Sequence, residues 1–188
     1  MVSKVQIFNR ALTEAGGRPT VLDPDEGSEG AILCRNNYDL TLDEVLRAHP
    51  WNFAKRRQQL AAKGSSPLFE FGNCFALPSD PFCLRFLNAN TELSVQVEGR
   101  DLLTDAAAPL QIAFIARVED PELFDPLFAS ALALNLANVI APKLNRKESQ
   151  EKRIWDKYLQ KLSLARSIDG MEGTPVDPQT DAFLNARL

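Results

Sequence analysis

The sequence predicts a mainly α-helical domain with a β insertion, an α+β fold. Apolar residues recur at helical spacing in both ends of the chain, whereas period-two alternation appears within the segment 67–118. The 188 residues are 45% hydrophobic and 24% charged, as in an ordinary globular protein, and they suffice to bury a single core. We therefore expect a bundle of about four helices with a small antiparallel β region at about 67–118. Residues 1–170 are expected to form one domain, followed by an extended C-terminal tail at 171–188.

Two amphipathic helices are predicted at the N-terminus. Ser3 can cap a helix over about 4–15, which Gly16-Gly17 would end. Turn-forming residues follow, and Ser28 can then cap a second helix over about 28–49. The inward stripe of this second helix comprises Ala31, Cys34, Tyr38, Leu42, Val45 and Leu46.

A proline marks the end of the second helix. Pro50 lacks a backbone N–H and disfavours helical geometry at His49, so the chain should bend there. Because proline is favourable at the first position of a helix, we predict a further short helix over about 51–62. Pro50, Trp51 and Phe53 then form a structural corner between two helices.

The middle third of the chain is predicted to be β. The segment TELSVQVEGRDLLTD has the pattern of a hairpin that turns at Glu98-Gly99-Arg100. Gln111 to Val118 has the pattern of a more buried strand. A first strand is indicated by apolar residues at odd positions, namely Phe69, Phe71, Phe75 and Leu77.

Two further helices are predicted after Pro121. Residues 122–144 are apolar on nearly every side of a helix, which is typical of a central one. Residues 147–169 are amphipathic, so this last helix should pack against the core on one side only. Its apolar face is expected to contain Trp155, Tyr158, Leu162, Ala165 and Ile168.

Composition excludes several classes of protein. A net charge of −4 argues against a free-standing nucleic-acid binder, which needs clustered Lys and Arg to neutralise phosphates. The N-terminus lacks an apolar run behind a basic start, so we expect no signal peptide. The most apolar stretch, 127–141, is shorter than a membrane span and is interrupted by asparagines, so it predicts a core helix and no membrane contact. Three cysteines without CxxC spacing predict reduced thiols.

Candidate chemical sites have plainer explanations. His49 is the sole histidine and lies at a predicted helix end, where a structural role is favoured over one in nucleophilic catalysis. The intervals between Cys34, Cys74 and Cys83 match no zinc pattern, and no phosphate-binding loop motif is present. We expect no cofactor, no metal and no catalytic residue. An acidic cluster is best explained as a solvated loop and helix start, and comprises Asp23, Asp25, Glu26 and Glu29.

Three consecutive cations follow the aromatic corner. Lys55, Arg56 and Arg57 beside Trp51 and Phe53 could bind single-stranded nucleic acid by stacking and backbone contacts. On a helix, however, three successive residues fan over most of a turn and cannot form one flat patch. The favoured interpretation is that the aromatics anchor the corner and the cations are solvated or paired.

An ordered series of short motifs is more specific than any of these sites. The first helix ends in Gly-Gly, and the segments that follow are LRAHPWNFA (46–54), FALPSD (75–80), VEG (97–99), IARVED (115–120) and FDPLF (124–128). In this order the series, which covers roughly residues 3 to 170, resembles the head-to-tail adaptor family of tailed phages. These are the connector proteins also called tail tubular protein A in short-tailed phages.

The resemblance implies a function in virus assembly. It implies a ring, usually of twelve copies, that docks beneath the portal protein and extends the DNA exit channel toward the tail. The implied partners are the portal, the downstream tail (nozzle) protein, other copies of the chain, and double-stranded DNA that passes without sequence-specific binding. Such proteins are not enzymes. The implied location is the neck of the virion, after synthesis in the host bacterial cytoplasm.

The C-terminal tail is the part that the resemblance assigns to portal docking. It is too polar to build a core, but an apolar cluster near its end could anchor in a partner groove and order on binding. Simple terminal disorder is the competing interpretation. The tail residues of this hypothesis are Phe183, Leu184, Arg187 and Leu188. The alternative function from another class is a phage single-stranded nucleic-acid binding or packaging-regulatory protein.

Overall fold

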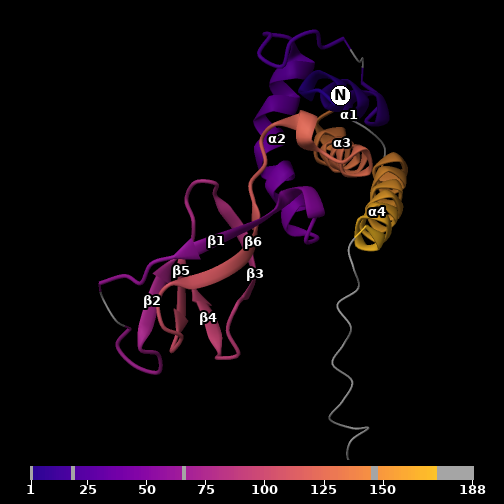
Figure 1. The fold of residues 1–188 in the computed structure, drawn as a ribbon. Coiled ribbons are helices and arrows are strands. Elements are labelled where there is room, and N and C mark those ends of the chain that lie inside the picture. Colours follow the sequence, from indigo (N-terminus) through magenta and orange to yellow (C-terminus); the bar gives the residue numbers. More distant parts are fainter. Residues whose placement is uncertain (1, 18–19, 65–66, 145–147, 173–188) are drawn as a thin grey trace, which may run out of the picture.

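The structure, a computed structural model, describes residues 2–17, 20–64, 67–144 and 148–172. A bundle of four helices carries a β module at one end (Figure 1). The helices are α1 (Lys4–Glu14), α2 (Glu29–Arg47), α3 (Pro126–Ile140) and α4 (Glu148–Met171). The α+β class with four helices and a small antiparallel β region is confirmed.

Local capping explains where three of the helices begin. The Ser3 hydroxyl accepts a hydrogen bond from the Gln6 amide, and the Gln6 side chain returns one to the Ser3 amide, which completes a capping box. Ser28 caps α2 by accepting from the Ala31 amide. Asp125 caps α3, because its carboxylate accepts hydrogen bonds from the backbone amides of Leu127 and Phe128.

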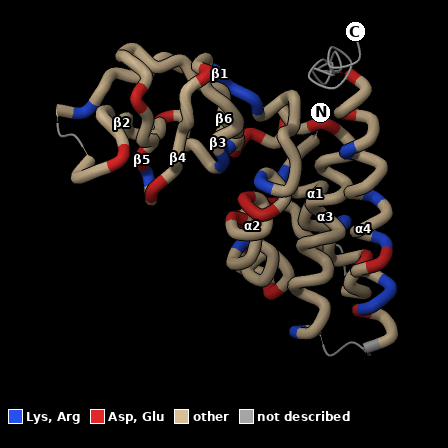
Figure 2. The backbone as a smooth tube through the Cα atoms, turned by 90° about the horizontal axis from the view of Figure 1, so that it is seen from below, with Lys and Arg blue, Asp and Glu red and all other residues tan. Residues whose placement is uncertain are grey.

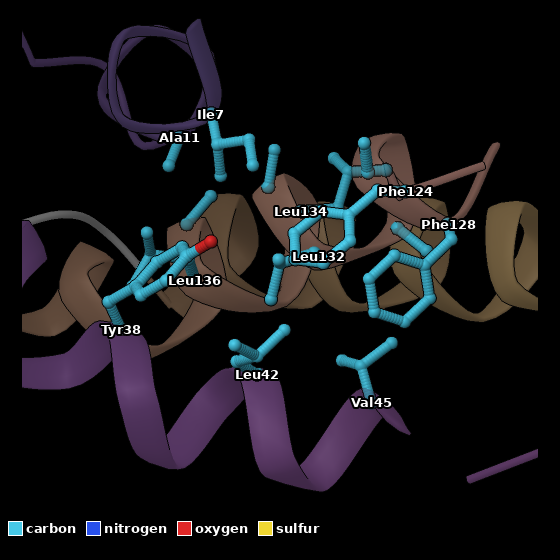
Figure 3. Close-up of a cluster of buried hydrophobic side chains, with 14 of the residues drawn as sticks. Ile7, Ala11, Tyr38, Leu42, Val45, Phe124, Phe128, Leu132, Leu134 and Leu136 are labelled. Atoms are coloured by element: carbon cyan, nitrogen blue, oxygen red, sulfur yellow. The ribbon is translucent and has the colours of Figure 1, made fainter. Parts of the chain in front are cut away.

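Helix α3 is the centre of the bundle. It packs against α1, α2 and α4, and nearly all its side chains from Phe128 to Ala137 are buried. Figure 3 shows its large side chains between those of α1 and α2. With the short 3₁₀ turn η3 (Ala141–Leu144), this segment is long and apolar enough to cross a membrane, but 61% of that window is buried inside the protein. It is therefore packed as a core helix is.

Six strands form two small antiparallel sheets. In the first sheet β6 (Leu110–Ala116) lies between β1 (Lys55–Leu60) and β3 (Cys83–Ala89). In the second, β5 (Asp101–Thr104) lies between β2 (Asn73–Ala76) and β4 (Val95–Glu98). The module has its own hydrophobic cluster, separate from that of the bundle, with Phe75, Leu102, Leu110 and Phe114 among its most buried members.

Two strand predictions are confirmed and one is wrong. The hairpin turns at Gly99-Arg100, where Gly99 has a φ of +58° that a side chain would disfavour. The buried strand near 111–118 is β6. The predicted strand through Phe69 and Phe71 is absent, since only Asn73–Ala76 pairs and the Phe69 side chain is 73% exposed. An alternating run is not a strand unless another strand satisfies its backbone.

The predicted helix over 51–62 is also wrong. Asn52–Ala54 makes a single 3₁₀ turn, η1, and the chain then enters β1. The residues KRRQQL are good helix formers in isolation. Each of them instead has a partner in β6, from Lys55 opposite Ile115 to Leu60 opposite Leu110. Pairing with a strand that lies far away in sequence overrides the local preference, so the corner joins a helix to a strand.

The two C-terminal helices differ from their predicted bounds. Helix α3 starts at Pro126, after the separate 3₁₀ turn η2 (Pro121–Leu123), because a proline fits only in the first turn of a helix. Helix α4 buries Ile154, Tyr158, Leu162 and Ala165, whereas Trp155 and Ile168 lie on its flanks, 41% and 38% exposed. The predicted apolar face was therefore correct in its centre and too wide at its edges.

Candidate functional surfaces

The corner after α2 is a packing element. Trp51 is fully buried, and its indole N–H donates to the Val45 carbonyl at 2.9 Å. Its ring meets Phe128 edge to face at 5.1 Å between centroids, and Phe53 does the same at 4.9 Å. Pro50, half-buried, lies directly before this pair. The corner thus ties the start of β1 to the central helix.

The three cations lie on β1 and do not form a patch with the aromatics. Side chains alternate along a strand, so Arg56 points to one face of the sheet, and Lys55 and Arg57 to the other. The Arg56 guanidinium donates to the carbonyls of Phe53 and Lys55, both at 2.9 Å. The run appears in blue near the start of β1 in Figure 2. Because Trp51 is fully buried, it has no free face on which a base could stack.

His49 fastens the C-terminal end of α4 to the corner. Its Nε2 lies 3.0 Å from Oδ2 of Asp169, which is only 8% exposed. The other carboxylate oxygen of Asp169 accepts from the Asn52 amide at 3.0 Å, and the Asn52 side chain donates to the Asp169 carbonyl at 2.6 Å. Burial lowers the pKa of His49, and the neighbouring Asp169 offsets part of that effect. The histidine is therefore held neutral, as the donor in a structural hydrogen bond.

The cysteines are inert. All three are buried and reduced, and burial raises the pKa of the Cys34 thiol to about 12. Burial also raises the pKa of Cys83 and of Cys74. Over the described ranges, no group of three or more His, Cys, Asp or Glu side chains is arranged to hold a metal ion.

The acidic segment before α2 organises its own loop. Glu26 accepts from the amides of Leu22 and Asp23 at 2.9 and 3.1 Å and from the Ser28 hydroxyl. These hydrogen bonds, that of Ser28 above all, lower the pKa of Glu26. The carboxylate of Asp23 accepts from the Asp25 amide. This segment behaves as the turn that precedes a helix.

Arg117, which belongs to the IARVED motif but for which the sequence predicted no structural role, joins the two parts of the molecule. Arg117, directly after β6, contacts Asp43 at 2.7 Å, Glu119 at 2.6 Å and Asp39 at 3.3 Å. Asp39 and Asp43 are one turn apart on α2, so the guanidinium holds the exit of the β module against that helix. Spacing along the chain gave no signal for it, because α2 and β6 are more than 60 residues apart.

The outer face of the first sheet has a polar hollow of about 600 Å³. It lies across the distal ends of β1, β6 and β3, where the sheet extends past the helices. Gln111 and Asn90 meet across it, because the Asn90 side-chain amide donates to Gln111 Oε1 at 3.2 Å. The polar residues that line it are Arg57, Gln58, Gln59, Asn88, Asn90 and Gln111.

The predicted tail residues Phe183, Leu184, Arg187 and Leu188 lie outside the described residues. Comparison of the chain with protein-family models and with curated proteins finds no match.

Proposed function

We propose that this protein is a phage head-to-tail adaptor. In this role, copies of the chain assemble as a ring beneath the portal, connect the capsid to the tail and extend the DNA exit channel. The observation that best supports the proposal is the two-part shape, in which a β module with open strand edges projects from a helical bundle (Figure 1). A closed ring needs two different surfaces on each copy that meet head to tail. A bundle and a projecting module offer such surfaces.

The charge of the chain suits a conduit. A net charge of −4 disfavours tight binding of a phosphate backbone, so DNA could slide past the ring without being held. Both signs of charge alternate along α4 (Figure 2), and its outward face is a candidate for contacts with other copies. The partners of the proposal are the portal, the next tail protein, further copies of this chain and the passing double-stranded DNA. The protein is then a virion component of the neck, made in the bacterial cytoplasm, and not an enzyme.

The decisive experiment is the solution mass of the purified protein, measured by light scattering alone and after mixing with the portal ring of the same phage. We expect either a multimeric ring alone or a co-eluting complex that carries about as many copies as the portal. A monomer that ignores the portal under all conditions would contradict the proposal.

Truncation after Gly173 tests whether the tail docks on the portal. We expect the truncated protein to keep its fold, because all the described helices and strands end before Gly173. It should lose most of its affinity for the portal in the same light-scattering assay. Unchanged portal binding would show that the tail is dispensable, and docking would then belong to the bundle or the β module.

The competing function, single-stranded nucleic-acid binding, has less support. It relied on Trp51 and Phe53 as stacking platforms, and both are packed against Phe128. Single-stranded nucleic-acid binding would be favoured again if the protein bound DNA with an affinity that falls with salt and Arg56→Ala abolished that affinity.

A further inference from the structure

The free edge of β1 presents specific backbone groups. The register within the first sheet shows which groups these are. Just after β3, the Asn90 backbone amide donates to the Gln111 carbonyl of β6 at 2.8 Å, so the N–H and C=O groups of odd-numbered β6 residues point toward β3. Backbone groups of successive residues in a strand point to opposite neighbours. The even-numbered residues of β6 therefore bond to β1, where Phe114 faces Arg56 and Ile112 faces Gln58. It follows that the N–H and C=O groups of Arg57 and Gln59 point away from the sheet.

The free edge of β4 is similar. The Leu77 amide, just after β2, donates to the Arg100 carbonyl at 2.8 Å, so the backbone groups of Arg100 point toward β2. Because these groups alternate along a strand, the N–H and C=O groups of Asp101 and Leu103 point toward β4. Their partners are Glu98 and Gln96. The backbone groups of Val95 and Val97 therefore point outward. Each edge presents two N–H and two C=O groups at alternate residues.

Both edges are accessible. On β1 the four residues from Arg56 to Gln59 are exposed, and on β4 the three from Gln96 to Glu98 are exposed, with 47% of the Val97 side chain in contact with solvent. Among the described residues, no carboxylate pairs with Arg56 or Arg57, and no cation pairs with Glu98. Open edges that carry unpaired charge of opposite sign are complementary.

We propose that β1 of one copy pairs with β4 of the next copy in antiparallel orientation, with Arg57 opposite Val97 and Gln59 opposite Val95. This register lets the outward groups of both edges exchange hydrogen bonds. It also sets Arg56 opposite Glu98 in a non-hydrogen-bonded position, where side chains approach most closely. The inference rests on the proposed function, because it names the contact that would build the ring.

The faces of the two sheets permit this pairing. Arg56 lies on the face of the first sheet that includes Phe114 and is covered by the second sheet of its own copy. Val97 is paired with the fully buried Leu102, so it lies on the face of the second sheet that the first sheet covers. Glu98, the next residue along the strand, therefore lies on the uncovered face. In the joined sheet the covering layers of the two copies therefore lie on opposite sides and do not collide.

The β4 edge of a second copy fits β1 better than the β1 edge of a second copy does. In a β1-to-β1 pair whose register is centred on Arg56 or Arg57, that cation lies directly opposite its own counterpart, which is unfavourable, and no register brings an opposite charge to β1. Pairing β1 with β4 is heterologous, so every copy keeps one edge of each kind for its two neighbours, as a closed ring requires.

Disulfide trapping tests the register. Opposite residues in non-hydrogen-bonded antiparallel pairs have Cα atoms about 4.5 Å apart, which is within the range of a disulfide. We expect Arg56→Cys/Glu98→Cys to give a ladder of covalent multimers on oxidation. Either single variant should remain uncoupled alone, and the two mixed should give dimers only. Arg56→Cys/Gln96→Cys, shifted along the edge by two residues, is the matched control and should couple poorly.

Charge reversal separates this inference from the proposed function. We expect Arg56→Glu and Glu98→Arg each to weaken assembly about fivefold per contact, the double variant to restore it, and Glu122→Arg, an exposed reversal away from both edges, to have no effect. If the wild-type protein assembles on the portal and these reversals and the disulfide pair have no effect, the edge contact is refuted while the adaptor function stands. If the wild-type protein never assembles, both are refuted.

Discussion

Tyr38 and His49 show how single buried polar groups set local energetics. The Tyr38 ring packs edge to face on Phe8 at 5.5 Å, and Lys4 Nζ lies 4.7 Å from the ring centroid. Its hydroxyl is buried and makes no hydrogen bond within the described structure. His49, by contrast, has a partner in Asp169. A buried polar atom without a partner costs free energy, and one with a partner contributes modestly.

Removal of the Tyr38 hydroxyl should not harm the protein. Tyr38→Phe keeps the ring and its contact with Phe8 and eliminates an unpaired buried group. We expect the free energy of unfolding to stay the same or rise by about 1 kcal/mol, measured by urea denaturation. A loss of more than about 1 kcal/mol would show that the hydroxyl has a partner, such as a bound water. Tyr38→Leu, which also removes the ring, is the control that should destabilise.

The His49–Asp169 hydrogen bond predicts a specific pH dependence. The folded state lowers the pKa of His49 below its ordinary value, so the unfolded chain binds the proton more tightly. The contribution of neutral His49 to stability is therefore complete above about pH 6.5 and is lost as the pH falls through the folded-state pKa. His49→Gln keeps a donor for Asp169 without a titrating group. We expect the variant to lose less stability than wild type between pH 7 and 5, and parallel pH curves would contradict this.

At the scale of elements, residues that follow a local rule were predictable and those that depend on a distant partner were not. Helices α1 and α2 follow from caps and apolar stripes, and the hairpin follows from its glycine turn. The sequence KRRQQL favours a helix locally, and only β6, some 55 residues later, makes it a strand. Phe69 and Phe71 alternate like strand residues but find no partner strand. The Arg117 contacts with α2 are equally non-local, so no spacing rule could have found them.

The start of α3 gives a quantitative test of capping. Asp125 accepts from the amides of Leu127 and Phe128 at 2.8 and 3.0 Å. We expect Asp125→Ala to lower the free energy of unfolding by about 1 kcal/mol, whereas Asp125→Ser, which retains a capping oxygen, should lose much less. Thermal or urea unfolding of the pair measures the difference. Equal losses in the two variants would mean that the carboxylate contributes through its charge and not through the cap.

At the scale of the whole molecule, two hydrophobic clusters are joined. The bundle and the β module each have a buried core. They are connected by the Trp51 corner, by Leu84 of β3 and Ile115 of β6, which are buried in the cluster of the bundle, and by polar contacts. In addition to the Arg117 ion pairs, Arg47 donates to the Leu84 carbonyl and Arg85 donates to the Arg47 carbonyl. These contacts set the direction in which the module projects from the bundle.

Arg117→Met should therefore affect assembly more than folding. Its ion pairs are partly exposed, so we expect a loss of about 1 kcal/mol or less in the free energy of unfolding. Without these ion pairs the module should sample more orientations, which small-angle scattering would record as a larger mean dimension. If the proposed adaptor function holds, binding to the portal should also weaken. Lys152→Met, which removes an exposed cation from α4, is the control for the change in charge. A large loss of stability with unchanged assembly would contradict the proposed role.

The strands β1 and β6 lie side by side and antiparallel, so the chain enters and leaves the β module at the same place. Residues 61–109 are therefore an insertion whose two ends are neighbours. The part of it that lies beyond Leu84 and Arg85, which contact the bundle, can change in length and content without moving α2 or α3. Such an arrangement suits exchange by recombination: a module with another edge or another polar face could be grafted onto an unchanged bundle. The module would then diverge quickly between related proteins while the helices keep their core.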